Sequence, residues 1–362
     1  MPAWFSGGPP VDGVDGARGS TSALGRVLDW GASALPGLVL CALFVLSLIA
    51  GRLTAPLGVD FREFEVHPGE GLSSVLIRLG EDGPRGLLIK AYARLADLDP
   101  LVRGRYRIQP RDTAFDLLDR LIRGDQIFYR FTVPEGLRAR DFIDILQRAD
   151  HIAVTLRGES PEDIARRLGI EHLEGWLAPD TYVYSAGTSD IDILRLALRQ
   201  QREILERLWA GRADGLPLKT PYEALTLASI VEKESAVQSE RAEIAGVFVR
   251  RLQRRMRLQS DPTVIYGLGD AYKNNITRRH LDARTPYNTY TISGLPPTPI
   301  ALPGLHAIEA VMHPAEGETL YFVAIGDDSG RHRFSVTYAE HRAAVREMLR
   351  LQKRRRSKKN SR

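Results

Sequence analysis

Apolar residues first mark one long uninterrupted stretch near the N-terminus. No charged residue occurs between Trp30 and Gly51, and Leu, Val, Ala, Ile and Phe dominate the stretch. A helix needs roughly 20 such residues to cross the hydrocarbon core of a bilayer. A cleavable signal peptide is the competing interpretation, but the stretch is long and lacks a small-x-small cleavage site before Arg52. The pattern therefore predicts a transmembrane helix over residues 30–52, after a disordered segment over residues 1–29.

Three later segments repeat one pattern. In each, the end of an apolar strand is followed by a proline-containing turn, and the turn is followed by Leu and Ile residues at helical spacing. The segments are residues 66–79, 108–121 and 133–146. The recurrence predicts a βα module used more than once, and hence a small α+β domain over residues 61–150. Chance recurrence of a common supersecondary unit is the alternative.

A buried helix is predicted after residue 219. Thr220 is suited to the N-cap, Pro221 to the first helical position, and Glu223 lies three residues after the cap. Residues 224–231 are apolar on nearly every face, which is typical of a helix that is buried on all sides.

A second helix and a hairpin are predicted further along. After Ser239, one helix face is largely apolar and contains Ile244, Val247, Phe248, Arg251 and Leu252. Residues 320–325 and 332–336 read as strands on either side of a turn rich in Gly and Asp. These elements predict a larger mixed α+β domain over residues 160–350, so the fold class is α+β.

Composition and charge change this picture little. The 362 residues carry a net charge of +5, and residues 353–362 alone hold seven basic side chains and no acid. Such a run predicts a solvated, disordered tail over residues 351–362 rather than a nucleic-acid module. The single cysteine, Cys41, excludes a disulfide framework within the chain, and the eight histidines lack metal-ligand spacing. We expect no metal site and no cofactor.

Two carboxylates end the predicted buried helix. At about 100° per residue, Glu234 falls on its most apolar stripe, whereas Glu232 falls nearly opposite. A carboxylic acid held against apolar side chains loses hydration, which raises its pKa and keeps it protonated at neutral pH. A general acid for glycosidic cleavage needs this property. Spacing alone leaves open that both residues are exposed, or that one pairs with Lys233 or Arg241.

Several blocks resemble the MltG-type (YceG-like) endolytic murein transglycosylases, in the order of that family. They are residues 174–182, 227–235, 256–267 and 286–297, followed by His313-Pro and Tyr321-Phe-Val. The resemblance implies that Glu234, and not Glu232, is the catalytic residue. Ser235, where the family often has Thr, and Ala178, where an aromatic residue is frequent, are small departures.

The resemblance also implies a mechanism that uses one carboxylate. Glu234 protonates the oxygen that leaves the anomeric carbon of muramic acid, and then takes the proton from the C6 hydroxyl of the same sugar to close a 1,6-anhydro ring. Because the nucleophile belongs to the substrate, its effective concentration replaces an activated water. Two-carboxylate glycosidases need a second acid, and Asp261 in that role would favour hydrolysis.

Two short segments supply the candidate substrate-binding residues. They are Gln259, Ser260, Asp261, Tyr287, Asn288, Thr289 and Tyr290. The first three can orient Glu234 or the substrate. The other four can offer a stacking face and hydrogen bonds to sugar hydroxyls or N-acetyl groups.

Members of the family have a short cytoplasmic end, one membrane helix and a LysM-like domain. The resemblance therefore implies a single-pass protein of the bacterial inner membrane, with residues 61–150 LysM-like and the catalytic domain extracytoplasmic. It implies peptidoglycan as substrate and peptidoglycan synthases (penicillin-binding proteins) as partners, and no nucleic acid. Charge alone does not set the orientation, because the basic residues on the two sides of the apolar stretch balance. A hydrolytic muramidase and a non-catalytic wall-binding scaffold are the alternatives.

Overall fold

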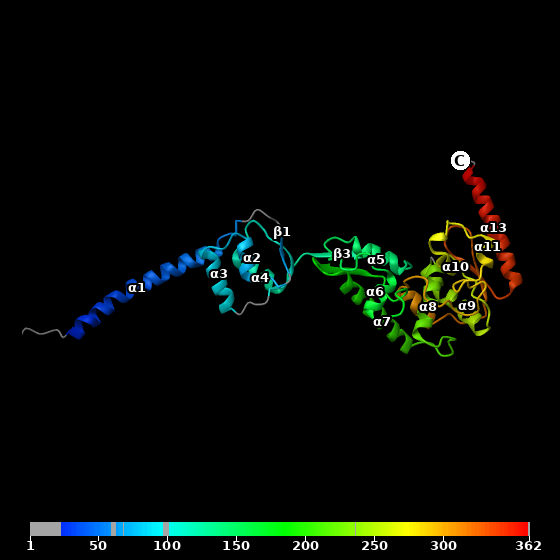
Figure 1. Ribbon diagram of the computed structural model, residues 1–362, viewed down its shortest axis with the longest axis horizontal. Coiled ribbons are helices and arrows are strands. Elements are labelled where there is room, and N and C mark those ends of the chain that lie inside the picture. Colours follow the sequence, from blue (N-terminus) through cyan, green and yellow to red (C-terminus); the bar gives the residue numbers. More distant parts are fainter. Residues whose placement is uncertain (1–22, 59–62, 68, 97–100, 236, 361–362) are drawn as a thin grey trace, which may run out of the picture. The chain divides into compact units, whose positions relative to one another are not determined.

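The computed structural model divides the chain into two compact units, Met1–Gln126 and Ile127–Arg362 (Figure 1). The structure describes residues 23–58, 63–67, 69–96, 101–235 and 237–360. Both units mix helices with antiparallel strand pairs, which confirms the α+β fold class.

The first element, α1 (Ala23–Thr54), contains the predicted membrane segment. Its part Pro36–Thr54 is long and apolar enough to cross a membrane, with a mean hydropathy of 2.1, and almost none of it is covered by protein. A membrane-spanning helix satisfies its own backbone groups and presents such an apolar surface to lipid. Residues 23–29 are helical where we expected disorder, and residues 1–22 lie outside the described residues.

In its described residues, the first unit also contains two βα modules and one further helix. They comprise β1 (Glu63–Val66), α2 (Leu72–Arg78), α3 (Pro84–Leu95), β2 (Gly104–Arg107) and α4 (Ala114–Arg123). The strands β1 and β2 pair antiparallel, with Phe64 opposite Tyr106. Tyr106, Val75 and Leu121 are fully buried in the core between the strands and the helices. The helical spacing of Leu and Ile that predicts these modules therefore marks their buried faces.

The third predicted module belongs to the second unit. It comprises β3 (Phe128–Thr132) and α5 (Ala139–Gln147), and β3 pairs antiparallel with β4 (Thr181–Ser185). Because β3 finds its hydrogen-bond partner some 50 residues further along the chain, at β4, it folds with the second unit. The division after Gln126 thus lies earlier than the boundary at residue 150 that the repeated pattern predicts.

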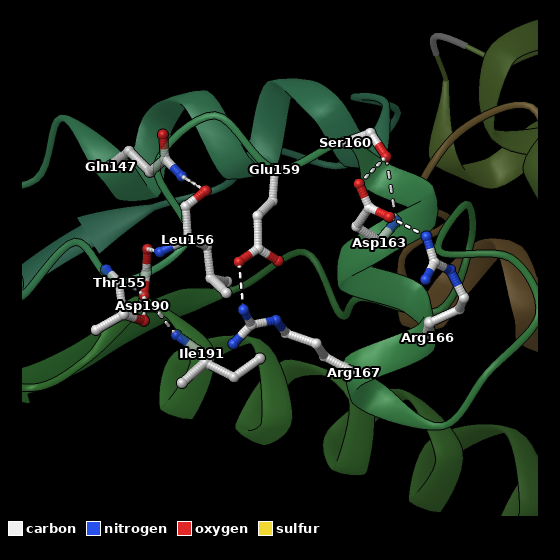
Figure 2. Close-up of polar contacts among 10 residues, drawn as sticks. All are labelled: Gln147, Thr155, Leu156, Glu159, Ser160, Asp163, Arg166, Arg167, Asp190 and Ile191. Atoms are coloured by element: carbon white, nitrogen blue, oxygen red, sulfur yellow. Dashed lines mark hydrogen bonds and ion pairs between the residues drawn. The ribbon is translucent and has the colours of Figure 1, made fainter.

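Two helices, α6 (Pro161–Leu168) and α7 (Asp190–Ala210), complete this part of the unit. Asp190 at the start of α7 is fully buried, and Figure 2 shows its carboxylate accepting hydrogen bonds from the backbone N–H groups of Thr155 and Leu156, both at 3.0 Å. A buried charge needs such partners. The carboxylate therefore holds the loop before α6 against α7.

The core of the second unit surrounds α8 (Pro221–Glu234). It packs against α12 (Leu305–Met312) and α9 (Arg241–Gln253), which follows the short 3-10 turn η1 (Gln238–Glu240). Residues 224–231 are all buried, and the Thr220 hydroxyl accepts a hydrogen bond from the Glu223 N–H at the helix start. The predicted buried helix and its cap are confirmed, as is the helix after Ser239.

The other described elements of the second unit lie between Asp261 and Asn360. They are α10 (Asp261–Leu268), η2 (Gly269–Ala271), α11 (Arg278–Asp282), β5 (Tyr321–Ala324), β6 (His332–Ser335) and α13 (Tyr338–Asn360). The strands β5 and β6 form the predicted hairpin. The expected disordered tail is wrong for residues 351–360, which continue α13 as a helix. The Glu340 side chain accepts hydrogen bonds from the N–H groups of Val336 and Thr337, the two residues before α13. Lys and Arg, which are frequent along the helix, are good helix formers.

Candidate active site

Glu234 is the last residue of α8, the most deeply buried helix of the second unit. After it, Ser235 leaves the helix with extended backbone dihedrals, φ −103° and ψ 112°. The Ser235 hydroxyl donates a hydrogen bond of 2.7 Å to the carbonyl of Val237, which fixes this exit. Glu234 is therefore attached to a rigid element, while its carboxyl group lies where the helix ends.

The carboxyl group of Glu234 is held by Ser260. The Ser260 hydroxyl donates to Glu234 Oε1 at 2.6 Å, and the Ser260 backbone N–H donates to Thr289 Oγ1 at 2.9 Å. Ser260 is only 1% exposed, so its hydroxyl is held within the protein and not at the surface. Among the described residues, no hydrogen bond engages the other carboxyl oxygen, Oε2.

Burial raises the pKa of Glu234 from its ordinary value of 4.5 to about 7. The nearby charge of Asp261 also raises this pKa, whereas the hydrogen bond from Ser260 and the positive charge of Arg251 lower it. Desolvation outweighs the stabilising contacts because the carboxylate form loses its hydration. The group is therefore both protonated and ionised in appreciable amounts at neutral pH.

Glu234 lines a cavity of about 520 Å³. The cavity is also lined by Arg251, Leu258, Gln259, Asp261, Tyr290, Phe322, Val323, Ala324, His332, Tyr338 and His341. Its walls come from α9, the segment before α10, the β5–β6 hairpin and the first turn of α13. A cavity of this volume falls within the range of small-ligand sites, about 300–1,000 Å³.

Asp261 and Tyr290 form a hydrogen-bonded pair on this wall. The Tyr290 hydroxyl donates to Asp261 Oδ1 at 2.7 Å, and Asp261 itself is exposed. Burial raises the pKa of Tyr290, and the hydrogen bond to Asp261 raises it further, so the phenol keeps its proton.

Gln259 adopts a left-handed backbone conformation, with φ 53°. Its N–H donates to the Thr289 carbonyl at 3.2 Å, and its side-chain oxygen accepts from Arg251 at 3.3 Å. This conformation is uncommon for a residue with a side chain, and contacts of this kind maintain it. It turns the chain immediately before Ser260.

The other predicted contact residues lie elsewhere. Asn288 is 1% exposed, and its amide donates to the carbonyls of His280, Leu281 and Ala283. Thr289 is fully buried and supports Ser260 from behind, while Tyr287 lines a different cavity. The structure therefore brings Gln259, Ser260, Asp261 and Tyr290 to Glu234, but it does not bring Tyr287 and Asn288 to the same cavity.

Arg251 is a site residue that sequence reasoning placed on a helix face but did not assign. It is 7% exposed, and its guanidinium donates to the carbonyls of Leu320, Arg257 and Leu258 at 2.7, 3.1 and 2.9 Å. Burial lowers the pKa of Arg251 from its ordinary value. A charged residue on an otherwise apolar helix face was the signal that could have identified it.

His332 and Glu240 form a second unassigned feature of the site. Glu240 is buried, and its carboxylate accepts from the backbone N–H of His332 at 3.0 Å and lies 2.9 Å from His332 Nδ1. His332 is the first residue of β6 and lines the Glu234 cavity. No local pattern marks this pair, because 92 residues separate its members along the chain.

Glu232 has a different environment from Glu234. Its carboxylate lies 2.6 Å from Arg241 Nη2 and accepts a hydrogen bond from the N–H of Gly304. The sequence left open which of the two carboxylates pairs with Arg241, and in the structure it is Glu232. Only Glu234 of the two faces the cavity.

Within the part of the chain that the structure describes, the fold and the site define an α+β protein with a helix long and apolar enough to span a membrane, and with a carboxyl group of raised pKa, Glu234, that lines a cavity. The chain belongs to the YceG-like family, because the model of that family matches residues 64–347.

Relatives of known name extend this finding. The chain is 35% identical over 194 residues to the endolytic murein transglycosylase of Bacillus subtilis strain 168, in a match that covers 52% of each chain. It is 30% identical over 277 residues to the protein of the same name from Streptococcus pneumoniae serotype 2 strain D39, covering 66% of this chain and 49% of that one. The chain thus spans about half the length of these curated relatives. The crystal structure of a yceG-like protein from Listeria monocytogenes is 26% identical, with a TM-score of 0.47 and coverage of 78% of this chain and 98% of that one.

Proposed function

We propose that the Ile127–Arg362 unit cuts the glycan strands of peptidoglycan by lytic transglycosylation, with Glu234 as its single acid and base. One observation carries the proposal: a carboxyl group with a pKa of about 7 lines a cavity, with one oxygen held by Ser260. An acid with this pKa gives a proton and takes one back at neutral pH. The names of the relatives from B. subtilis and S. pneumoniae support the same reaction.

In the first step, protonated Glu234 gives its proton to the oxygen that links muramic acid to the next sugar. The bond between that oxygen and the anomeric carbon breaks, and the leaving sugar carries away the proton. Glu234 then accepts the proton of the C6 hydroxyl, whose oxygen bonds to the anomeric carbon. The glycan ends in a 1,6-anhydro ring, the enzyme returns to its protonated form, and no water is consumed.

The geometry of Glu234 suits both steps. Ser260 stabilises the carboxylate through Oε1, which leaves Oε2 for the substrate. Because Glu234 is attached to a buried helix, the substrate meets a fixed group, and a fixed group needs little reorganisation during reaction. Asp261 accepts a hydrogen bond from the Tyr290 hydroxyl, and we assign Asp261 a role in positioning the substrate.

Four other residues complete the proposed glycan-binding wall. They are Arg251, Gln259, Tyr290 and His332, which all line the Glu234 cavity. They present amide, phenol, imidazole and guanidinium groups, which pair with the hydroxyl and N-acetyl groups of sugars. Asn288 and Thr289 act indirectly, because they hold the segment that carries Tyr290.

The location that we propose follows from α1 and from the substrate. Peptidoglycan lies outside the cytoplasmic membrane, so the second unit would be extracytoplasmic and the N-terminus cytoplasmic, with α1 spanning the inner membrane. The first unit, with its two βα modules, would act as a LysM-like wall-binding domain. Peptidoglycan synthases are the proposed partners, since cleavage beside the membrane would end the growth of nascent strands.

Digestion of purified peptidoglycan tests the reaction. The full-length protein in detergent and its Glu234→Gln variant are incubated with purified peptidoglycan, and the products are identified by mass spectrometry. Internal 1,6-anhydromuramyl ends from the wild type and none from Glu234→Gln are expected. Reducing ends would replace the proposal with a hydrolytic muramidase, and glycan binding without cleavage would replace it with a wall-binding scaffold.

A further inference from the structure

The second unit contains another cavity that shares no lining residue with the Glu234 cavity. Its volume is about 330 Å³, at the lower end of the range for ligand sites, about 300–1,000 Å³. The side chains of Arg138, Glu174, Tyr266 and Tyr287 define its walls. The proposed reaction makes no use of this cavity.

A half-buried carboxyl group, Glu174, forms part of the wall. Its Oε1 accepts a hydrogen bond of 2.9 Å from the Ala139 N–H at the start of α5, and its Oε2 accepts one of 3.1 Å from the Tyr266 hydroxyl. Burial raises the pKa of Glu174 to about 7. The group therefore presents a hydrogen-bond donor in its protonated form and only acceptors in its ionised form.

Two aromatic rings and one guanidinium lie beside this carboxyl group. The rings of Tyr266 and Tyr287 have centroids 4.9 Å apart and are tilted by 56°. The guanidinium carbon of Arg138 lies 5.0 Å from the Tyr266 centroid, and within the described part of the chain no hydrogen bond or ion pair engages that guanidinium. The cavity thus combines apolar ring surface with donors that are free for a ligand.

The charges around the cavity favour a neutral ligand. Arg140 lies on the wall but is 2.8 Å from Asp270, which neutralises it. Glu162 and Glu171 also line the cavity and oppose the charge of Arg138. An anion would meet these carboxylates, and a cation would meet Arg138. A neutral molecule with an apolar face and several hydroxyl or amide groups has neither penalty.

We propose that this cavity binds one N-acetylated sugar of a glycan, distinct from the sugar at Glu234. The rings of Tyr266 and Tyr287 take the apolar face of the sugar. Arg138 and Glu174 pair with its hydroxyl or acetamido groups. The proposal rests on the proposed function for the identity of the ligand, since a glycan is the only polymer that the reaction requires.

The two cavities are joined by two segments of chain. Tyr266 lies on α10, and the residue before α10 is Ser260, which holds Glu234. Tyr287 is followed two residues later by Thr289, which accepts the hydrogen bond from the Ser260 backbone. A sugar against Tyr266 and Tyr287 would therefore contact the same segments that position the catalytic carboxyl group.

Photo-crosslinking tests this site without the need for catalysis. The probe is tetra-N-acetylchitotetraose with a diazirine at its reducing end, added to the full-length protein in detergent. After irradiation and proteolysis, mass spectrometry locates the label. We expect label on residues 138–140 and 171–174, competed by unlabelled chitotetraose and at least fivefold weaker in Arg138→Gln. Arg148→Gln is the matched control, because Arg148 is exposed at the other end of α5 and lies outside the cavity.

The outcomes separate this proposal from the proposed function. If the label is found at the second cavity and no anhydro products are formed, the sugar site is supported and the proposed transglycosylase reaction is contradicted. Anhydro products with label only around the Glu234 cavity, or with equal label in Arg138→Gln and wild type, would overturn the sugar site. On long strands, the site also predicts a KM several-fold higher in Arg138→Gln with kcat unchanged, and equal KM values would contradict it.

Discussion

Ser260 Oγ lies 2.6 Å from Glu234 Oε1, although 26 residues separate the two along the chain. This hydrogen bond stabilises the ionised form of a carboxyl group that burial otherwise keeps protonated. The two effects oppose each other, and their balance leaves the pKa of Glu234 at about 7. Because this pKa lies near neutral pH, the one carboxyl group can act both as the acid and as the base of the proposed reaction.

Replacing Ser260 with Ala should disturb this balance. Loss of the donor disfavours the carboxylate, so the pKa of Glu234 rises and the alkaline limb of the pH–activity profile moves to higher pH. A hydrogen bond to a charged group contributes about 1.5–3 kcal/mol, so kcat should fall about tenfold or more. The measurement is the pH profile of anhydro-product formation. A rate lowered equally at every pH would mean structural damage and would contradict this role for Ser260.

The substitutions Glu232→Gln and Glu234→Gln should have opposite effects on activity and on stability. Glu234→Gln removes the proposed acid and should abolish activity with little loss of stability. Glu232→Gln breaks the buried pair with Arg241, which typically costs about 3–5 kcal/mol of unfolding free energy, but leaves the cavity intact. Thermal unfolding and activity below the melting temperature check both outcomes. Loss of activity in a folded Glu232→Gln protein would contradict the assignment.

Stability of the second unit should fall as pH rises from 5 to 8. Burial raises the pKa values of Glu234 and Glu174 from 4.5 to about 7, so the folded state binds these protons more tightly than the unfolded chain. The stabilisation is complete below about pH 4.5 and is lost as pH rises through 7. Each pKa unit corresponds to about 1.4 kcal/mol, which gives on the order of 3 kcal/mol at most for each group.

Urea unfolding at several pH values measures this loss. Glu234→Gln and Glu174→Gln should each flatten the dependence of unfolding free energy on pH. The double variant should flatten it further. An unchanged dependence in both single variants would show that these groups do not hold their protons in the folded state.

Glu240→Ala should destabilise the β5–β6 hairpin. The change leaves the His332 N–H without its acceptor and removes the carboxylate 2.9 Å from Nδ1, and an unsatisfied buried group costs about 1–3 kcal/mol. Because His332 lines the Glu234 cavity, KM for glycan should rise as well. Thermal unfolding and steady-state kinetics check these effects.

The pair His306–Glu309 provides the matched control. Its side chains are 49% and 45% exposed, and an exposed pair of this kind contributes about 0–1 kcal/mol. Glu309→Ala should therefore leave both stability and KM nearly unchanged. If Glu240→Ala and Glu309→Ala change stability and KM equally, the buried Glu240–His332 pair contributes no more than an exposed pair.

Local patterns predicted the elements that local interactions form. The cap at Thr220, the buried helix and the β5–β6 hairpin depend on residues that are close in sequence. The position of Glu234 on an apolar stripe also anticipated its raised pKa, because burial is the largest cause of that shift.

Features that depend on residues far apart in the sequence could not be predicted from local patterns. The division between units depends on the pairing of β3 with β4, which strand propensity does not specify. The segment that contains Asn288 is irregular: the Asn288 amide donates to neighbouring backbone carbonyls, whereas Tyr290, two residues later, lines the Glu234 cavity. No periodicity separates an inward polar side chain from an outward one in such a loop. Sequence blocks shared with a family therefore mark structural residues as well as contact residues.

Arg251 joins two segments of chain that are distant in sequence. One guanidinium binds the carbonyl of Leu320, just before β5, and those of Arg257 and Leu258, on the other side of the cavity. A lysine has one compact head group and cannot reproduce this planar fork. The hydrogen bonds of this one side chain thus help to fix the spacing of two segments that border the proposed glycan site. A change at Arg251 should therefore alter the spacing of these two segments as well as the positive charge beside Glu234.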